Sequence, residues 1–285
     1  MSSEVQPVLV SSREDGITIL SLNWPHRRNA IDPIAAKCLF DKLLAFENDP
    51  SQKVCILTGV GGTFCAGFDL FHSAASSDGD KKAEYDSKDE GYHFSTPPES
   101  AQPSIGPLGP TRQHVKKPLI CAIAGYAVGG GLELSLLCDI RVVEEDAVFG
   151  IFSRRWGIPL LDGSTVRLQA VVGLGRALDI ILTGRSVDAN EALTMGLANR
   201  VVSKGKALEE AIAIAKQLVS FPQQGMNADR NSCYYSAYDA SSFHDGIRQE
   251  YEKGKGLLDT KAVSAVTQFR QGAGRHGGYK RDSHL

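Results

Sequence analysis

The sequence predicts an α/β protein with a partly parallel sheet and a helical C-terminal region. The prediction rests on a pattern of strand, helix and strand between Gly16 and Thr58, on further buried-strand patterns from Leu119 to Val202, and on helical periodicity from Lys206 onward. With 285 residues, of which 42% are hydrophobic, the chain is long enough to bury a full core.

The first strand is expected at Gly16–Leu22, where β-branched and aliphatic residues end at a loop that contains Pro25. A helix follows over residues 34–46, with apolar residues at helical spacing and Asp32 as its N-cap. A second buried strand is expected at Val54–Thr58. Strand, helix and strand at this spacing form a right-handed crossover, so the two strands should be parallel.

The rest of the chain divides into a core and a helical region. The stretch Ser73–Thr111 is rich in Ser, Asp, Lys, Pro and Gly, so we expect a mobile, substrate-facing insertion that adds little to the core. The expected domains are a core over residues 1–205, with the insertion at 73–111, a helical region over 206–275, and a tail over 276–285. Further strands are expected at 119–124, 139–143, 147–150 and 201–202, and further helices at 163–172, 188–195, 206–219 and, after a break at 222–225, up to about Phe269.

Composition excludes several classes of partner. The formal net charge of -2 leaves no excess of basic residues for a phosphate backbone, so nucleic acid is not expected as the main partner. No apolar run reaches membrane-spanning length and the first residues lack the pattern of a secretory signal, so we expect neither secretion nor membrane insertion. The six cysteines show no CxxC spacing, which favours a reducing compartment and no metal.

The C-terminal residues Ser283, His284 and Leu285 resemble the Ser-Lys-Leu peroxisomal address, with a basic residue in the middle. We therefore expect recognition by a peroxisomal import receptor and a peroxisomal location. The alternative is an ordinary frayed tail on a cytoplasmic protein.

Glycine clusters mark the candidate site. A loop whose N–H groups must converge on one oxygen needs residues that adopt unusual backbone angles, which glycine does. Gly129–Gly131 also precede an apolar helical stretch, Leu132–Leu137, so their N–H groups should lie at the positive end of a helix dipole. A nucleotide site is not indicated, because the sequence contains neither GxGxxG in its usual context nor GxxxxGK[ST].

The order of these clusters is typical of one family. The segments Asn23–Asp32, Gly61–Leu70 and Ala124–Leu134 resemble successive signatures of the crotonase (enoyl-CoA hydratase/isomerase) superfamily, over about residues 16–275. The resemblance implies a spiral of ββα units with a helical C-terminal region, and trimers that often pair into hexamers. It also implies an acyl-CoA thioester substrate, with coenzyme A entering as part of the substrate and no other cofactor.

The resemblance also implies binding residues. The backbone N–H groups of Phe68 and Gly130 would form an oxyanion hole for the thioester carbonyl. Phe68 stands where the family often has alanine, so its side chain should narrow the neighbouring pocket. Among the basic residues of the loop, Arg28 is favoured for the CoA phosphates, although adjacent surface cations are often simply solvated. The remaining residues that match the family's CoA contacts are Ala30, Ala66, Asp69 and Leu70.

Glu133 matches a family position used as a general acid or base. Standard hydratases have a second glutamate, and Ser153 stands at that position here. Asp162 could be a displaced second acid or the N-cap of the following helix, and the sequence leaves both open. Arg154 and Arg155 could bind a substrate carboxylate, but solvated or ion-paired side chains are favoured.

We therefore expect an enoyl-CoA hydratase, which reversibly adds water to a 2-enoyl-CoA. The alternatives within the class are a double-bond isomerase or another hydrolase or lyase of this type. An alternative of a different class is a non-catalytic or RNA-binding homologue, against which the mild acidity argues.

Overall fold

The computed structural model describes residues 6–70 and 104–270 of the chain. Contacts divide it into two units, Met1–Lys216 and Gln217–Leu285. All of the described strands belong to the first unit, and the second holds two long helices, α8 (Gln223–Tyr238) and α9 (Phe243–Arg270). None of the helices among the described residues is both long and apolar enough to cross a membrane.

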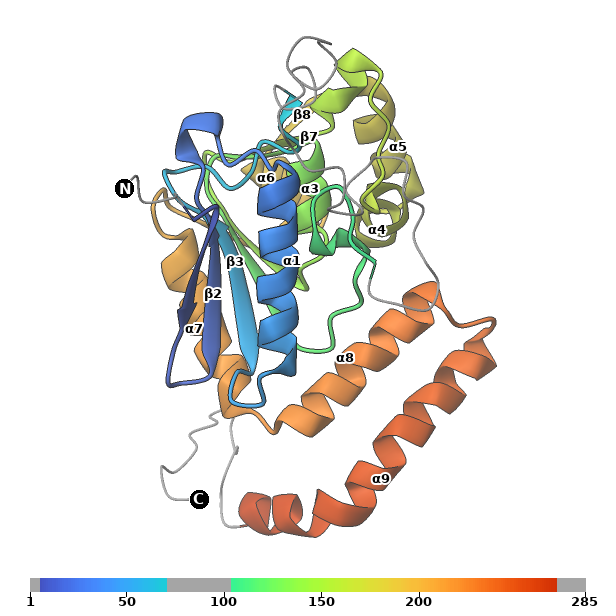
Figure 1. Ribbon diagram of the computed structural model, residues 1–285. Coiled ribbons are helices and arrows are strands. Elements are labelled where there is room, and N and C mark those ends of the chain that lie inside the picture. Colours follow the sequence, from blue (N-terminus) through green and yellow to red (C-terminus); the bar gives the residue numbers. More distant parts are fainter. Residues whose placement is uncertain (1–5, 71–103, 271–285) are drawn as a thin grey trace. The chain divides into compact units, whose positions relative to one another are not determined.

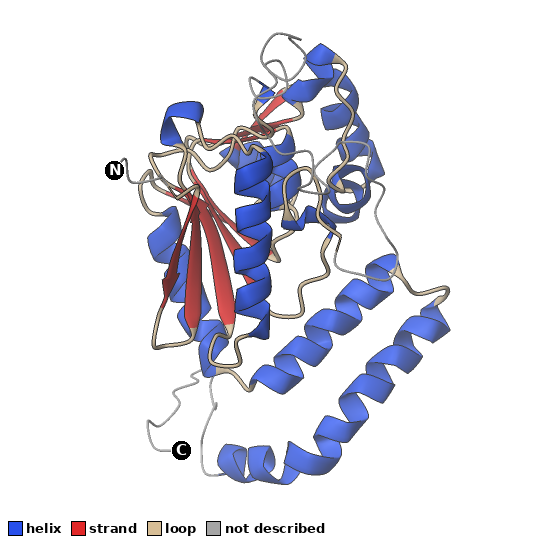
Figure 2. Cartoon of the chain, viewed as in Figure 1, coloured by secondary structure: helices blue, strands red, loops and turns tan. Residues whose placement is uncertain are grey.

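A twisted, mostly parallel sheet organises the first unit (Figure 2). Strand β1 is antiparallel to β2, and every further neighbour in the sheet is parallel. Because β2 and β3 pair in parallel, with Ile17 opposite Val54, the predicted crossover is confirmed. In sheet order the strands are β1 (Val8–Ser12), β2 (Ile17–Leu22), β3 (Val54–Gly59), β4 (Leu119–Ile123), β6 (Ile140–Glu144) and β9 (Arg200–Val202).

A smaller sheet consists of β5 (Tyr126–Val128), β7 (Val148–Gly150) and β8 (Ser186–Asp188), in the order β5-β7-β8. β5 and β7 are parallel, and β7 and β8 are antiparallel. The turn that leaves β4 leads directly into β5, so the small sheet continues from the edge where the parallel strands end.

Helix α1 (Pro33–Asn48) connects β2 to β3 and covers one face of the large sheet (Figure 1). Its predicted cap is confirmed, because Asp32 Oδ1 accepts a hydrogen bond from Ala35 N at 2.7 Å. The other helices of this unit are η1 (Pro25–Arg27), η2 (Pro110–Arg112), α3 (Gly130–Ser135), η3 (Phe152–Trp156), α4 (Ser164–Val172), α5 (Leu174–Thr183), α6 (Ala189–Thr194) and α7 (Ala207–Ser220), which ends beyond the unit boundary.

The segment 104–113 corrects the sequence-based prediction for the insertion. Residues 71–103 lie outside the described residues, but Leu108 is 1% exposed and Thr111 is fully buried. The expectation that this stretch adds little to the core is therefore wrong at its C-terminal end. The Gly and Pro residues that suggested a loop instead allow the chain to turn back tightly against α1, where Gly109 adopts a φ of 83° and packs on the carbonyl of Ala36.

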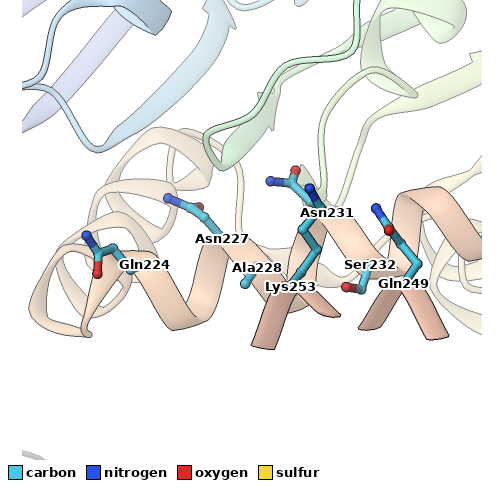
Figure 3. Close-up of a pocket in the computed structure, with 7 residues that line it drawn as sticks. All are labelled: Gln224, Asn227, Ala228, Asn231, Ser232, Gln249 and Lys253. Carbon is cyan, nitrogen blue, oxygen red and sulfur yellow. The ribbon is translucent and has the colours of Figure 1, made fainter. Parts of the chain in front are cut away.

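In the second unit, α8 and α9 lie side by side as an antiparallel pair (Figure 1). Since α8 already begins at Gln223, the helical break is shorter than the predicted 222–225. A cavity of about 330 Å³ lies between the two helices, and Figure 3 shows the side chains that line it, most of which carry polar groups. The lining residues include Asn227, Asn231, Gln249 and Lys253.

Candidate active site

The candidate site is built where the parallel strands β3 and β4 end. Open α/β sheets usually bind ligands at this edge. The chain leaving β3 returns beside β5, because Cys65 N donates to Tyr126 O at 2.9 Å and Val128 N donates to Cys65 O at 3.2 Å. On its other side, the same segment pairs with the loop before α1, since Ile31 N donates to Gly67 O at 2.8 Å. The peptide between Gly67 and Phe68 is thus fixed from both sides.

Gly67 lies directly against the turn that begins α3. Its φ is 94°, and a Cβ atom there would come within 2.9 Å of Gly130 N and 3.0 Å of Val128 O. Only glycine fits both the backbone angle and this close approach. The structure therefore brings together the two predicted oxyanion residues, Phe68 and Gly130, which are far apart in the sequence.

Gly130 opens α3 and is partly exposed, whereas Gly129 and Gly131 are buried. The N–H of Gly129 donates to Gly150 O at 2.8 Å, and those of Leu132 and Glu133 donate to Gly129 O. Within residues 6–70 and 104–270, no hydrogen bond has Gly130 N as its donor. This N–H group is consequently available to an incoming acceptor.

Glu133 lies in the first turn of α3 and is 4% exposed. Its Oε1 accepts hydrogen bonds from the N–H groups of Asp162, at 3.0 Å, and Ser164, at 3.3 Å. Burial, together with the neighbouring charge of Asp162, raises the pKa of Glu133 to about 8. Glu133 Oε2 takes part in no hydrogen bond among the described residues.

Asp162 is 3% exposed and uses one oxygen to bind the segment 104–113. Its Oδ1 accepts from Leu108 N at 3.2 Å and from the hydroxyl of Thr111. The alternative role as a helix cap is wrong, because the N-cap residue of α4 is Gly163 and the Asp162 carboxylate binds Leu108 N and Thr111 instead. Burial raises the pKa of Asp162, and the hydrogen bonds from Thr111 and Leu108 oppose that shift.

The comparison with known families decides the identification. The profile of the enoyl-CoA hydratase/isomerase family matches residues 12–96 and 98–242, which is most of the chain. The chain belongs to this family. It is therefore a member of the crotonase superfamily, and the mixed α/β fold predicted from the sequence is confirmed.

Individual relatives agree with this membership. Enoyl-CoA hydratase EchA19 of Mycobacterium tuberculosis is 35% identical over 219 residues, which cover 74% of each chain. Mevalonyl-coenzyme A hydratase sidH of Aspergillus fumigatus is 33% identical over 280 residues, covering 90% of this chain and 97% of the relative. The crystal structure of enoyl-CoA hydratase EchA1 from Mycobacterium marinum superposes with a TM-score of 0.78, at 27% identity, over 93% of this chain and 96% of that one.

The residues that match the family's CoA contacts divide into two groups. Arg28 and Ala66 lie near Gly67, Phe68, Gly129 and Gly130, which form the predicted oxyanion site and are called the oxyanion turn below. Ala66 N donates to Arg28 O at 3.0 Å, and the Arg28 guanidinium lies 5.3 Å from the ring centre of Tyr126. Asp69 is buried, and its carboxylate lies 4.0 Å from Arg27.

The other two residues are on the surface side of the same loops. Leu70 is 43% exposed. Ala30 lines a separate pocket of about 300 Å³, together with Trp24 and Ile34. The structure thus places Arg28 and Ala66 beside the oxyanion turn, and Ala30 at a second hollow.

Ser153, at the family's second-glutamate position, lies in η3. Its Oγ is buried and has no hydrogen-bond partner among the described residues. The adjacent arginines contact neighbouring residues of the protein. Arg154 Nε donates to Ile181 O at 3.2 Å, and the Arg155 guanidinium lies 4.4 Å from the ring centre of Phe152. Both arginines are exposed, and whether they bind a substrate carboxylate or are simply solvated or ion-paired stays a prediction.

Sequence reasoning missed the residues that surround Asp162. Leu108 and Thr111 approach it from one side, and Arg112 and Arg167 donate to the backbone carbonyls of Leu161 and Asp162. The only sequence signal for this contact was Leu108, a single leucine within the Gly- and Pro-rich segment Gly106–Arg112. A residue of this kind between tight turns can indicate a loop that is anchored in the core.

Proposed function

We propose that this protein is an enoyl-CoA hydratase, which reversibly adds water across the double bond of a 2-enoyl-CoA. One observation carries the proposal: two buried carboxyl-bearing residues, Glu133 and Asp162, lie beside the turn that holds Gly130, and Glu133 Oε1 accepts a hydrogen bond from the backbone N–H of Asp162. Two proton transfers are needed for hydration, so two such groups next to an oxyanion site suit this reaction. The relatives that are named hydratases support the same choice.

In this proposal, the backbone N–H groups of Gly130 and Phe68 hold the thioester oxygen. Negative charge develops on that oxygen when water attacks C3, and donors already in place stabilise it without reorganisation. The close packing of Gly67 on Gly130 N supports the assignment, because it fixes the distance between the two donor segments.

Glu133 and Asp162 divide the proton transfers. Since the pKa of Glu133 is about 8, Glu133 carries a proton at neutral pH and can supply it to C2. Asp162 takes the proton of the attacking water, and the hydrogen bonds from Thr111 and Leu108 N favour its ionised form against the effect of burial. Passing that proton from Asp162 back to Glu133 restores the starting state. The hydration rate should therefore fall as the pH rises through about 8.

Coenzyme A enters as part of the substrate, and the proposed reaction uses no further cofactor. Arg28 supplies positive charge for the CoA phosphates beside the oxyanion turn. The Phe68 side chain is half-buried and packs against the core, so it limits the acyl groups that fit next to the reacting carbonyl.

The test is to incubate the purified protein with a panel of 2-enoyl-CoA and 3-hydroxyacyl-CoA thioesters and to follow the products by mass. Gain or loss of one water is the expected result. Shift of the double bond in a 3-enoyl-CoA without hydration would establish an isomerase instead. Binding of RNA without binding of any acyl-CoA would support a non-catalytic homologue.

The peroxisomal location and the oligomeric state of the protein stay predictions. The residues Ser283, His284 and Leu285 lie outside the described residues, so peroxisomal import rests on the sequence alone. The homotrimer or hexamer implied by the resemblance would be measured by sedimentation of the purified protein.

A further inference from the structure

The segment 104–113 contains a tight turn that is closed by its own backbone hydrogen bonds. Gly106 and Gly109 exchange backbone hydrogen bonds, Gly106 N to Gly109 O at 2.7 Å and Gly109 N to Gly106 O at 2.8 Å. Pro110 then begins the short helix η2, which contains Thr111. Because Thr111 is fully buried, its hydroxyl has no access to solvent and must find its partner within the protein.

That partner is Asp162. The hydroxyl of Thr111 and the N–H of Leu108 both donate to Asp162 Oδ1. Gly106 packs directly against this contact, since a Cβ atom there would lie 2.5 Å from Asp162 Oδ1 and 2.6 Å from Thr111 Oγ1. Asp162 Oδ2, in contrast, takes part in no hydrogen bond among the described residues.

The two carboxyl groups are therefore bound in the same way. Each uses one oxygen to accept two hydrogen bonds from the scaffold, Oε1 in Glu133 and Oδ1 in Asp162, and keeps its other oxygen out of these bonds. Only Asp162 accepts a side-chain hydroxyl. Hydrogen bonds to a carboxylate favour its ionised form, and removal of a buried donor makes ionisation harder.

We propose that Thr111 is a positioning residue that keeps Asp162 ionised and fixes its free oxygen for the proton transfer from water. The proposal rests on the hydratase function proposed above. Thr111 itself touches neither substrate nor the reacting atoms, and it acts through Asp162. No family signature in the sequence includes Thr111, which lies at the end of the Gly- and Pro-rich stretch.

The test compares Thr111→Val, which keeps the shape but loses the hydroxyl, with Thr111→Ser, which keeps the hydroxyl. In Thr111→Val, kcat for hydration at neutral pH should fall about ten-fold or more, with KM little changed. The acidic limb of the pH profile should move to higher pH, because Asp162 binds its proton more readily. Thr111→Ser should restore both values. A matched control is Thr18→Val. Thr18 lies in β2, is also buried, and donates its hydroxyl to the side chain of Gln52.

A second measurement separates this inference from the hydratase proposal. Titration of the Asp162 carboxyl by carbon NMR should show a higher pKa in Thr111→Val than in the wild type, whatever reaction the protein catalyses.

If Thr111→Val leaves both the titration of Asp162 and the acidic limb of the pH profile unchanged, the inference is wrong, even if kcat falls. If the titration shifts but the wild type hydrates no enoyl-CoA, the hydratase proposal is wrong and the effect of Thr111 on Asp162 stands. Thr111→Ala replaces Thr111→Val if the latter does not fold.

Discussion

Glu133 Oε1 accepts a hydrogen bond from the backbone N–H of Asp162 at 3.0 Å, so the two buried carboxyl groups are held beside each other. The charge of Asp162, together with burial, raises the pKa of Glu133, so the two groups do not both ionise readily. The scaffold treats them differently: Asp162 accepts the Thr111 hydroxyl, while Glu133 accepts only backbone N–H groups. In the proposed mechanism, this difference makes Glu133 the proton donor and Asp162 the proton acceptor.

The oxyanion assignment predicts a specific effect of removing one N–H group. A side chain at position 130 would overlap Leu108 Cδ1, so we compare two double variants, Gly130→Ala and Gly130→Pro, each combined with Leu108→Ala. Proline is tolerated in the first turn of a helix but lacks the donor. The proline variant should lose about a hundred-fold in kcat relative to its alanine counterpart. Equal turnover in two folded variants would rule out Gly130 N as an oxyanion donor.

Phe68 should act through its side chain on substrate choice and through its backbone on catalysis. Phe68→Ala keeps the N–H group and opens the neighbouring space, so turnover should persist and the preference among acyl groups should change. Measuring kcat/KM for short, long and branched 2-enoyl-CoA thioesters checks this. A uniform loss of turnover for every thioester would contradict the assignment.

Asp162→Asn tests the second carboxyl group. Its amide oxygen can still accept from Thr111 and Leu108 N, so the thermal midpoint should change little. The side chain no longer accepts a proton from water, and kcat should fall by about two orders of magnitude or more. Near-normal turnover would show that Asp162 has a structural role and takes no part in proton transfer.

The raised pKa of Glu133 predicts how stability depends on pH. Below its ordinary value of 4.5, the carboxyl is protonated in the folded and the unfolded state. Between 4.5 and about 8, the unfolded state releases this proton and the folded state keeps it, so the wild type loses stability as the pH rises. Glu133→Gln has no such loss, and its thermal midpoint should exceed that of the wild type increasingly from pH 4.5 to 8. Glu14→Gln, at an exposed site, is the control for the loss of a charge, and parallel curves for Glu133→Gln and the wild type would disprove the prediction.

Local features of the structure could be predicted, and long-range ones could not. The caps Asp32 and Asp188 were predictable, because each side chain accepts from an N–H group only three residues later. The partners of Asp162, in contrast, are 54 and 51 residues away, at Leu108 and Thr111. Strand β1 was not predicted because it is an edge strand with only Val8 buried, which gives no clear alternation.

The oxyanion turn is an intermediate case. Its glycines were visible in the sequence, and the resemblance to the family indicated that they meet. Neither showed that Gly67 must lack a side chain to approach Gly130 N, or that Leu108 packs on Gly130. Those facts come from the way the segments between β3 and β5 pack at the end of the sheet.

The most direct test of the central claim is the turnover of Glu133→Gln on the 2-enoyl-CoA that the wild type hydrates best. Glutamine keeps an oxygen that can accept from Asp162 N and Ser164 N, but it has no proton to exchange. We predict that kcat falls by at least about two orders of magnitude, while the affinity for a non-reactive acyl-CoA stays nearly unchanged. Near-normal turnover in this variant would contradict the mechanism and assign the proton transfer to another group.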